Sequence, residues 1–385
     1  MNKQQEPRLR FKGFTGEWKN KTLGDLGRVE MCRRIFKEQT QPSGEIPFFK
    51  IGTFGQEPDA FISSELFEEY RQKYPYPKQG DILISAAGTI GRTVEFTGEN
   101  AYFQDSNIVW LRFDESQITS IFLNIIYQNI KWDLEGSTIK RLYNSDLLSA
   151  EITLPSLPEQ THLGLFFRCL DSQIAESRAV LEKSRQLKKA MLAKMFPANG
   201  EKIPKIRFKG FEGEWERKSL RDVLEIERKG KAQYQKLQAG NVPYLDAEFL
   251  NGGVKILTDA VPDVDVYDIL IIWDGSNAGK VYTGFNGVLG STLKSYRTNA
   301  DCSSIFLYQE LVRNEEVIFS QYRTPNIPHV IKNFSDEYNF LMPSYKEQTA
   351  IGLFFRQLDE TIALQSAEVE KLNQLKKGLL AAMLV

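Results

Sequence analysis

The sequence predicts an α+β chain in which two similar mixed α/β domains are separated by two long antiparallel coiled-coil helices, with a pseudo-twofold internal repeat. A short opening segment occurs twice, a longer segment of periodic apolar residues occurs twice, and both halves keep the same order. At roughly 150 residues per domain, 385 residues suffice for two or three domains. The halves therefore share one frame, although their middle parts barely resemble each other.

Two pairs of matching segments define the repeat. PRLRFKGFTGEWKNKTLGDL from Pro7 matches PKIRFKGFEGEWERKSLRDV from Pro204 at 12 of 20 positions. The 42-residue segment from Pro155 matches the segment from Pro343 at 24 positions. Chance does not produce two such matches in the same order. The chain therefore reads as an opening, a body and a tail, each present twice.

The domain boundaries follow from this order. We expect a first domain over 1–155, a first helical region over 156–197, a second domain over 198–342 and a second helical region over 343–385. The matching openings are 197 residues apart and the matching tails 188, so the second body is shorter than the first. A weaker match, GDILISAAGTIGR from Gly80 and YDILIIWDGSNAGK from Tyr267, gives each body an apolar strand that ends in a glycine-containing turn.

Each tail opens with the sequence of a capping box. Ser156 is followed three residues later by Glu159, and Ser344 by Glu347. In a capping box the serine hydroxyl and the glutamate carboxylate each accept a hydrogen bond from a backbone N–H of the first helical turn. We therefore expect each tail to form a long helix that begins at this box.

The apolar residues of the tails alternate four and three positions apart, which is the spacing of a heptad seam. The residues expected to pair the helices are Phe167, Leu170, Ile174 and Leu181 in the first tail, and Phe355, Leu358, Ile362, Val369 and Leu372 in the second. Such long helices favour packing of one on the other. The pair has to be antiparallel, because the linker 197–203 is too short to span its length. The alternative is that each helix lies on its own domain.

Short β-type runs and turn residues fill the bodies, at about residues 27–154 and 224–342, and predict mixed α+β domains. The expected strands are Ile46–Ile51, Asp81–Ser85, Thr93–Phe96, Ile108–Phe113, Val242–Leu245, Asp268–Trp273 and Lys280–Tyr282. Helices are expected over Ser120–Ile130 and Ile305–Arg313.

Composition excludes several classes of protein. With 42% hydrophobic and 26% charged residues, the chain is neither disordered nor collagen-like, and it has no apolar run long enough for a membrane helix. The N-terminal segment lacks the apolar core of a signal peptide. Cys32, Cys169 and Cys302 lie far apart and form no CxxC pair. We expect a cytoplasmic protein that binds neither a membrane nor a metal ion.

Catalytic motifs are missing from the sequence. The two histidines, His162 and His329, belong to no HExxH motif. GSNAGKV from Gly275 lacks the spacing and the hydroxyl residue of a phosphate-binding loop. The E-x-K triplets at Glu17 and Glu227 have no partner acid at nuclease spacing. We therefore expect the chain to carry no active site.

Cationic and hydroxyl side chains gather at similar places in both bodies. The clusters are Arg33, Arg34 and Lys37 in the first body, Arg228, Lys229, Lys231 and Lys236 in the second, and GSTIKRLY over 136–143 before the first tail. Such groups contact phosphates and base edges of DNA. The net charge of −1 argues mildly against a nucleic-acid partner. A solvated surface is the alternative for each cluster taken singly.

Four sets of motifs form a recognisable combination: RFKGFTGEW and RFKGFEGEW at the openings, GDILISAAGTIGR in the first body, GSTIKRLYNSDLLSAEITLPSLPEQ at the first junction, and the QLKK-containing tails. With these motifs the chain resembles, over nearly its whole length, the specificity subunits of type I restriction–modification enzymes. The family's junction reads Pro-Pro-x-x-Glu-Gln, whereas this chain has Pro155-Ser-Leu-Pro158-Glu159-Gln160. The second junction lacks the GSTIKRL pattern, so the resemblance gives no DNA-facing role to Pro328–Lys332.

The resemblance implies that each body is a target-recognition domain that reads one half of a bipartite, asymmetric site in double-stranded DNA. It implies that the helices set the distance between the halves and dock two modification subunits, which bind S-adenosylmethionine and methylate adenine. It further implies that two restriction subunits, which use ATP and Mg, can join and supply ATP-driven translocation and cleavage. The chain itself would hold no cofactor.

On this interpretation, seventeen residues are candidates for DNA contact. They are Arg33, Arg34, Lys37, Lys50, Thr89, Arg92, Ser137, Thr138, Lys140 and Arg141 in the first body, and Arg228, Lys229, Lys231, Lys236, Ser276, Asn277 and Lys280 in the second. Two alternatives stay open. A coiled-coil scaffold for protein interactions would show no salt-sensitive affinity for DNA, and an enzyme with an unrecognised site would methylate or cleave DNA alone.

Overall fold

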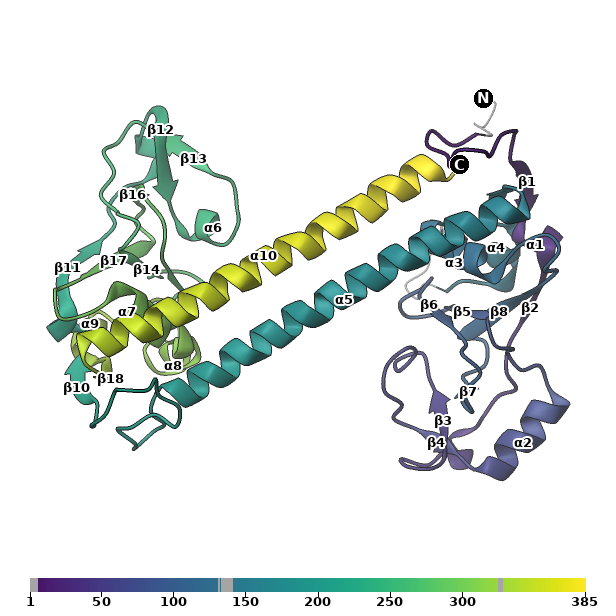
Figure 1. The fold of residues 1–385 in the computed structure, drawn as a ribbon, viewed down its shortest axis with the longest axis horizontal. Coiled ribbons are helices and arrows are strands. Elements are labelled where there is room, and N and C mark those ends of the chain that lie inside the picture. The colour runs from purple at the N-terminus through teal and green to yellow at the C-terminus, as the bar shows by residue number, and fades with distance from the viewer. Residues whose placement is uncertain (1–5, 131, 133–140, 325–327) are drawn as a thin grey trace. The chain divides into compact units, whose positions relative to one another are not determined.

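The computed structural model describes residues 6–130, 132, 141–324 and 328–385. The chain divides into two compact units. Unit 1 holds the described residues up to Ser177 together with Glu368–Val385, and unit 2 holds Arg178–Ala367. Each unit therefore contains one body, the first part of one long helix and the last part of the other (Figure 1).

Small sheets form the body of unit 1. β1 (Lys19–Thr22) pairs antiparallel with β9 (Glu151–Leu154). A four-stranded antiparallel sheet, the main sheet, has the order β2 (Gly27–Glu30), β8 (Ile108–Phe113), β5 (Ile82–Ser85) and β6 (Thr93–Glu95). A three-stranded sheet has the order β4 (Phe61–Ile62), β3 (Ile46–Phe49) and β7 (Tyr102–Phe103), in which β3 and β7 run parallel.

Short helices connect these strands. They are α1 (Leu23–Leu26), η1 (Lys37–Gln39), α2 (Ser64–Lys73), α3 (Ser120–Asn129) and α4 (Asn144–Ser149). Side-chain caps fix where the two ten-residue helices begin, because the backbone N–H of Leu66 donates to Ser63 and that of Phe122 donates to Thr119.

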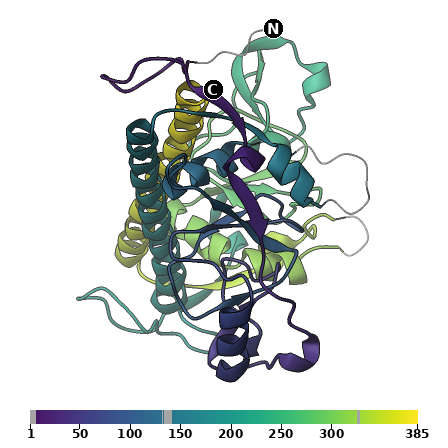
Figure 2. The ribbon, with the colours of Figure 1, turned by 90° about the vertical axis from the view of Figure 1, so that its right-hand side faces the viewer.

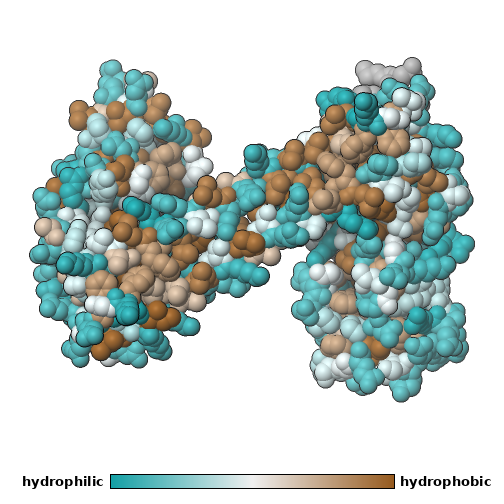
Figure 3. Space-filling model, viewed as in Figure 1, coloured by the Kyte–Doolittle hydropathy of each residue, from teal (hydrophilic) through white to brown (hydrophobic). Residues whose placement is uncertain are grey.

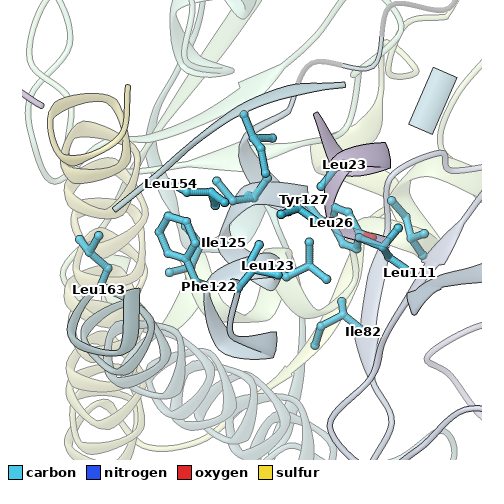
Figure 4. Packing of buried hydrophobic residues seen from close by; sticks show 14 of the residues in the cluster. Leu23, Leu26, Ile82, Leu111, Phe122, Leu123, Ile125, Tyr127, Leu154 and Leu163 are labelled. Carbon is cyan, nitrogen blue, oxygen red and sulfur yellow. The ribbon is translucent and has the colours of Figure 1, made fainter. Parts of the chain in front are cut away.

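Strand β5 separates two apolar cores, which explains why all four of its residues are buried. Ile82 and Ile84 point into a core shared with α3 and the first long helix, while Leu83 points into a core shared with the three-stranded sheet and α2. Side chains alternate across a strand, so a central strand between two cores reads as a continuous apolar run. Figure 4 shows the first core, where Phe122 of α3 lies close to Leu163 of the long helix.

The body of unit 2 repeats this strand order with a different sequence. Its strands are β10 (Glu216–Ser219) paired with β18 (Asn339–Met342), a main sheet of β11 (Leu224–Lys229), β17 (Leu293–Thr298), β14 (Ile269–Ile272) and β15 (Val281–Tyr282), and a third sheet of β13 (Ile256–Thr258), β12 (Ala239–Leu245) and β16 (Val288–Leu289). Its helices are η2 (Arg221–Val223), η3 (Tyr234–Lys236), α6 (Ala247–Leu250), α7 (Ser304–Arg313), α8 (Glu315–Gln321) and α9 (Phe334–Glu337). Each sheet therefore has the connectivity of its counterpart in unit 1.

One connection accounts for the different lengths of the bodies. Residues 63–81, which include α2, join β4 to β5, whereas the shorter segment 259–268 joins the equivalent strands β13 and β14. Within the described residues, α2 has no counterpart in unit 2. The largest difference between the strand connections thus lies at this loop, and the sheet framework is kept.

The long helices are α5 (Leu157–Met195) and α10 (Tyr345–Met383), each of 39 residues. In unit 1 the end of α10 packs beside the start of α5, where Met383 joins the core of Leu163 and Phe167. In unit 2 the end of α5 packs beside the start of α10. The helices are therefore antiparallel in both units, as predicted, and lie side by side in Figures 1 and 2.

Ion pairs between the helices repeat in the two units. Lys376 lies 2.5 Å from Asp171 in unit 1, and Lys188 lies 2.5 Å from Asp359 in unit 2. The two lysines occupy the same position of the repeat, and so do the two aspartates. Each ion pair therefore fixes the same antiparallel register.

The residues predicted to pair the helices differ in how deeply they are buried. Phe167, Leu170, Ile174, Leu181 and Phe355 are buried, and Leu358, Ile362, Val369 and Leu372 are partly buried. The alternative of a helix lying on its own domain is also partly right, because Phe167 and Leu170 pack on the body of unit 1 as well as on α10. Among the described helices, none combines the length and the apolarity needed to cross a membrane.

A glycine marks where α5 crosses α3. A Cβ on Gly164 would lie 2.5 Å from Cγ2 of Ile121, whereas a Cβ on Gly378 in α10 would meet nothing within 4 Å. Alanine in place of glycine stabilises an open helix by about 1 kcal/mol, but forcing atoms into a packed site costs about 1–3 kcal/mol.

Gly378→Ala is therefore expected to raise the free energy of unfolding by up to about 1 kcal/mol, and Gly164→Ala to lower it. Urea unfolding of both variants beside the wild type measures the two changes. Equal effects of the two variants would show that α5 and α3 are not in close contact.

Candidate nucleic-acid interface

An arginine of each opening segment holds the start of each long helix. Nε and Nη2 of Arg10 donate to the carboxylate of Glu159 at 2.7 and 2.8 Å, and Nη1 donates to the carbonyl of Gly16 at 2.7 Å. Nε and Nη2 of Arg207 donate in the same way to Glu347, both at 2.7 Å. We call each set the arginine clamp. Hydrogen bonding to Glu159 raises the pKa of Arg10 above its usual value.

The capping-box prediction was wrong for these glutamates. The carboxylates of Glu159 and Glu347 are engaged by the arginine clamps and not by the N–H groups of the serines three residues earlier. The helices begin at Leu157 and Tyr345, close to the predicted start. A bidentate guanidinium fork is the stronger partner for a carboxylate than a single backbone N–H.

The glutamine after each glutamate ties the helix to its body. The side-chain oxygen of Gln160 accepts from the N–H of Thr119, and its amide donates to the carbonyls of Gln117 and Pro155. Gln348 makes the equivalent bonds in unit 2. The arginine of each opening and the Glu-Gln pair of each junction therefore hold the start of a long helix on its body.

The topology brings the candidate residues of each body to one edge of its main sheet. In unit 1, β2 and β5 end at this edge while β6 and β8 begin there, because neighbouring strands run antiparallel. The connecting segments 31–36, 86–92 and 104–107 consequently meet at this edge. In unit 2 the edge is formed in the same way by β11, β14, β15 and β17. We call it the loop edge.

Most candidate cations of the first body are held by protein oxygens. Arg34 pairs with Asp105 at 2.9 Å, and Lys50 pairs with Asp59 at 2.9 Å. Arg92 and Arg141 donate to backbone carbonyls, of Gly55 at 3.2 Å and of Ser106 at 3.1 Å respectively. Lys37 and Thr89 are exposed on these loops. Ser137, Thr138 and Lys140 lie outside the described residues.

Arg33 differs from these cations in its surroundings. Its guanidinium carbon lies 5.4 Å from the centroid of the Tyr74 ring, at the end of α2. Both residues line a hollow of 500 Å³ together with Phe36, whose side chain is 57% exposed. The sequence analysis did not select Tyr74 or Phe36. Phe36 could have been found from the sequence, because it is an aromatic residue within a few positions of Arg33 and Arg34.

In the second body the candidates are spread over the same kind of loops. Lys229 lies 3.4 Å from Asp274, and Lys280 donates to Asn251 at 3.4 Å. Arg228 donates to the backbone carbonyl of Asp263. Ser276 and Asn277 line a hollow of 510 Å³ beside α6, and Lys231 and Lys236 are exposed on the loop after β11.

His329 occupies in the second body the place of Arg141 in the first. Arg141 forms a β-bridge with Ala87, and His329 forms one with Asp274, the residue equivalent to Ala87. The next residue donates its N–H to the same strand in both cases, from Leu142 at 2.8 Å and from Val330 at 3.0 Å. His329 was missed because the GSTIKRL pattern that introduces Arg141 is absent before it.

The loop edges carry side chains that suit contacts with DNA. Within residues 6–130, 132, 141–324 and 328–385, no three His, Cys, Asp or Glu side chains group as a metal site. Burial raises the pKa of the Cys32 thiol, which lines the hollow beside Arg33, to about 12. A thiol with such a pKa stays protonated and is a poor nucleophile. Cations, amides and hydroxyls remain, and these suit phosphates and base edges.

The chain matches a known protein family and is similar to a known protein. The family described as type I restriction modification DNA specificity domain matches residues 15–183 and 212–374. A protein of Haemophilus influenzae, assigned as the type I restriction enzyme specificity subunit S.HindORF215P, is 62% identical over 139 residues, or 36% of this chain and 36% of that protein. The match thus spans about a third of that relative's length.

Two solved structures share the fold. The crystal structure of a type I restriction-modification system S subunit from M. genitalium has a TM-score of 0.70 at 18% identity, covering 99% of both chains. A structure that addresses complex assembly and conformational transition of the type I R-M system has a TM-score of 0.51 at 15% identity, covering 96% of this chain and 98% of that one. At these identities the likeness concerns the fold.

Proposed function

Because this chain belongs to the family of type I restriction modification DNA specificity domains, we propose that it is the DNA-reading subunit of a restriction–modification complex. Each body reads one half of a bipartite site in double-stranded DNA. The observation that carries the proposal is the loop edge. The same strand order presents it in both bodies, and different side chains occupy it.

An unlike pair of loop edges suits an asymmetric site. Phosphate contacts fix the register of a protein on DNA, while side chains that meet base edges select the sequence. In the first body the edge carries Arg33, Arg34 and Arg141, whereas the second has Lys231, Ala232 and His329 at the equivalent places. A shared framework with exchanged contact residues therefore supports two different half-sites.

The long helices carry the features expected of a docking platform. Leu165 and Leu353 are 56% and 42% exposed at equivalent positions of α5 and α10, and Leu187 and Leu375 form a second equivalent pair at 48% and 50%. Figure 3 shows apolar side chains among polar ones along these helices. Exposed apolar side chains that gather on one surface mark interaction sites. Matched sets on both helices support two copies of one partner, the modification subunit.

The remaining chemistry belongs, in this proposal, to the partner subunits. The modification subunits bind S-adenosylmethionine and methylate adenine, and restriction subunits use ATP and Mg. The chain acts by placing these subunits on its site, and the unbroken helices α5 and α10 set the distance between the half-sites. A scaffold that does not bind DNA would leave the repeated loop edges and their cations without a role.

The test combines a binding measurement with methylation mapping. The chain, assembled with its modification subunits, is expected to bind a duplex that carries its site at least about a thousandfold more tightly than a scrambled duplex of equal length. Affinity for both duplexes should fall with rising salt, because bound phosphates release counterions. Methylated adenines mapped in genomic DNA identify the site. Equal affinity for both duplexes would refute the proposal.

A further inference from the structure

The cations of the first loop edge differ in how free their hydrogen-bond donors are to contact a base. The inference drawn from this difference rests on the proposed function. Arg34 is committed to Asp105, whose side chain is only 17% exposed, and Arg141 to the carbonyl of Ser106. Breaking such bonds to contact a base costs part of the binding energy that the new contact would supply. These residues are suited to shaping the edge and to contacting phosphates.

Arg33 has its hydrogen-bond donors available. In the part of the chain that the structure describes, its guanidinium donates no hydrogen bond, and the residue is exposed. Its guanidinium carbon lies 5.4 Å from the centroid of the Tyr74 ring, within the range of a cation–π contact. Such a contact attracts the cation without using its N–H donors.

The ring that holds Arg33 is itself fixed. Tyr74 ends α2, where its N–H donates to the carbonyl of Tyr70 at 3.0 Å and its ring meets that of Tyr70 at 5.2 Å. Pro75 follows and restricts the backbone of the residue before it. The hollow beside the stack is lined by apolar groups of Met31 and Phe36. An arginine that is already restrained by a neighbouring ring loses less side-chain entropy on binding.

We propose that Arg33 is the specificity-determining residue of the first body, that it reads a guanine through N7 and O6 in the major groove, and that Tyr74 positions it. Bidentate arginine–guanine pairing is the commonest specific contact in DNA recognition, and it requires a guanidinium fork with free donors. Arg33 meets this requirement. Lys37 is a point charge without a fork, and Arg34 has its Nε engaged by Asp105.

The described residues of the second body contain no equivalent of the contact between Arg33 and Tyr74, which agrees with an asymmetric site. Glu30 lies opposite Trp110 and Arg228 opposite Ser295, at equivalent positions of the two main sheets. Arg33 therefore corresponds to Lys231. Tyr74 follows α2, the helix without a described counterpart in unit 2. Among the described residues, the contact between an arginine and a tyrosine at the loop edge is thus found in the first body, and Lys231 is the matched control position.

The experiment measures discrimination one base pair at a time. The chain, assembled with its modification subunits, is titrated with its mapped site and with duplexes in which single G·C pairs are changed to A·T. For the wild type, one such change in the half-site of the first body is expected to weaken binding by about tenfold to a hundredfold. Arg33→Ala should bind the mapped site about as weakly and be indifferent to that pair, with discrimination at all other pairs retained.

Companion variants separate reading from charge and from folding. Arg33→Lys keeps the charge without the fork, so it should not regain discrimination. Tyr74→Phe keeps the ring and should discriminate, whereas Tyr74→Ala should lose discrimination in part. Lys231→Ala should leave the selective G·C pair unchanged.

A uniform loss of affinity in Arg33→Ala, with discrimination intact at every pair, would identify a phosphate contact and overturn this inference while leaving the proposed function in place. If the wild type does not distinguish its site from any changed duplex, the proposed function itself fails. The two failures are therefore distinguishable in one data set.

Discussion

Replacing Arg10 by alanine is expected to lower the free energy of unfolding of unit 1 by about 3–5 kcal/mol. The Glu159 side chain is 2% exposed and accepts two hydrogen bonds from Arg10. Without the guanidinium, the buried carboxylate at the first turn of α5 loses its main hydrogen-bond partner. The cost of an unpaired buried charge exceeds the net benefit of forming the pair, which is why this single substitution is so damaging.

Arg10→Lys should recover little of the loss, because one ammonium group cannot reproduce the two parallel bonds to the carboxylate or reach the carbonyls of Thr15 and Gly16. Adding Glu159→Gln to Arg10→Ala should restore part of the stability, because it removes the buried charge. Arg207→Ala should have a similar effect on unit 2, through Glu347.

The matched control is an exposed ion pair in unit 2. Lys202 and Glu214 pair at 2.9 Å with side chains 60% and 62% exposed, and loss of such a pair costs at most about 1 kcal/mol. Urea unfolding, followed by circular dichroism for each variant, gives the comparison. A loss for Arg10→Ala no larger than that for Lys202→Ala would mean that the clamp is not what anchors α5.

The arginine clamps also show which feature of the long helices could not be predicted from the sequence. Periodicity and the repeat predicted α5, α10 and their antiparallel seam, because those signals are local in the chain or duplicated in it. The partner of Glu159 lies 149 residues away in sequence. A local serine–glutamate pattern therefore suggested a capping box, and a distant guanidinium displaced it.

The loop edges were predicted only in part for a similar reason. The strand order β2-β8-β5-β6 is not sequential, so the meeting of segments 31–36, 86–92 and 104–107 cannot be read from spacing. Asp105 and Tyr74 decide what Arg34 and Arg33 can do, but both lie far from these arginines in the sequence. His329 shows the converse, since its equivalence to Arg141 is visible in the backbone bridges and not in the sequence.

Exchanging a body is expected to change one half of the recognised site and leave the other intact. The sharpest version replaces residues 27–150 with residues 224–338 of the same chain. The cut points leave the β1–β9 pair and the arginine clamp of unit 1 in place. Because both bodies have the same strand order, the transplanted body should fold on the first framework. Methylation mapping should then find the half-site of the second body twice and that of the first body nowhere.

The reciprocal exchange, with residues 27–150 in place of 224–338, should duplicate the other half-site and bring the Arg33–Tyr74 stack to both bodies. This variant should no longer recognise the half-site of the second body. Sequence selection depends on side chains at the loop edge, and the arginine clamps contribute no such side chains. Two outcomes separate the explanations. Duplicated half-sites mean that each body reads DNA independently. A changed half at the unexchanged body would mean that the partner subunits or the helices take part in selecting bases, and independent reading would have to be abandoned.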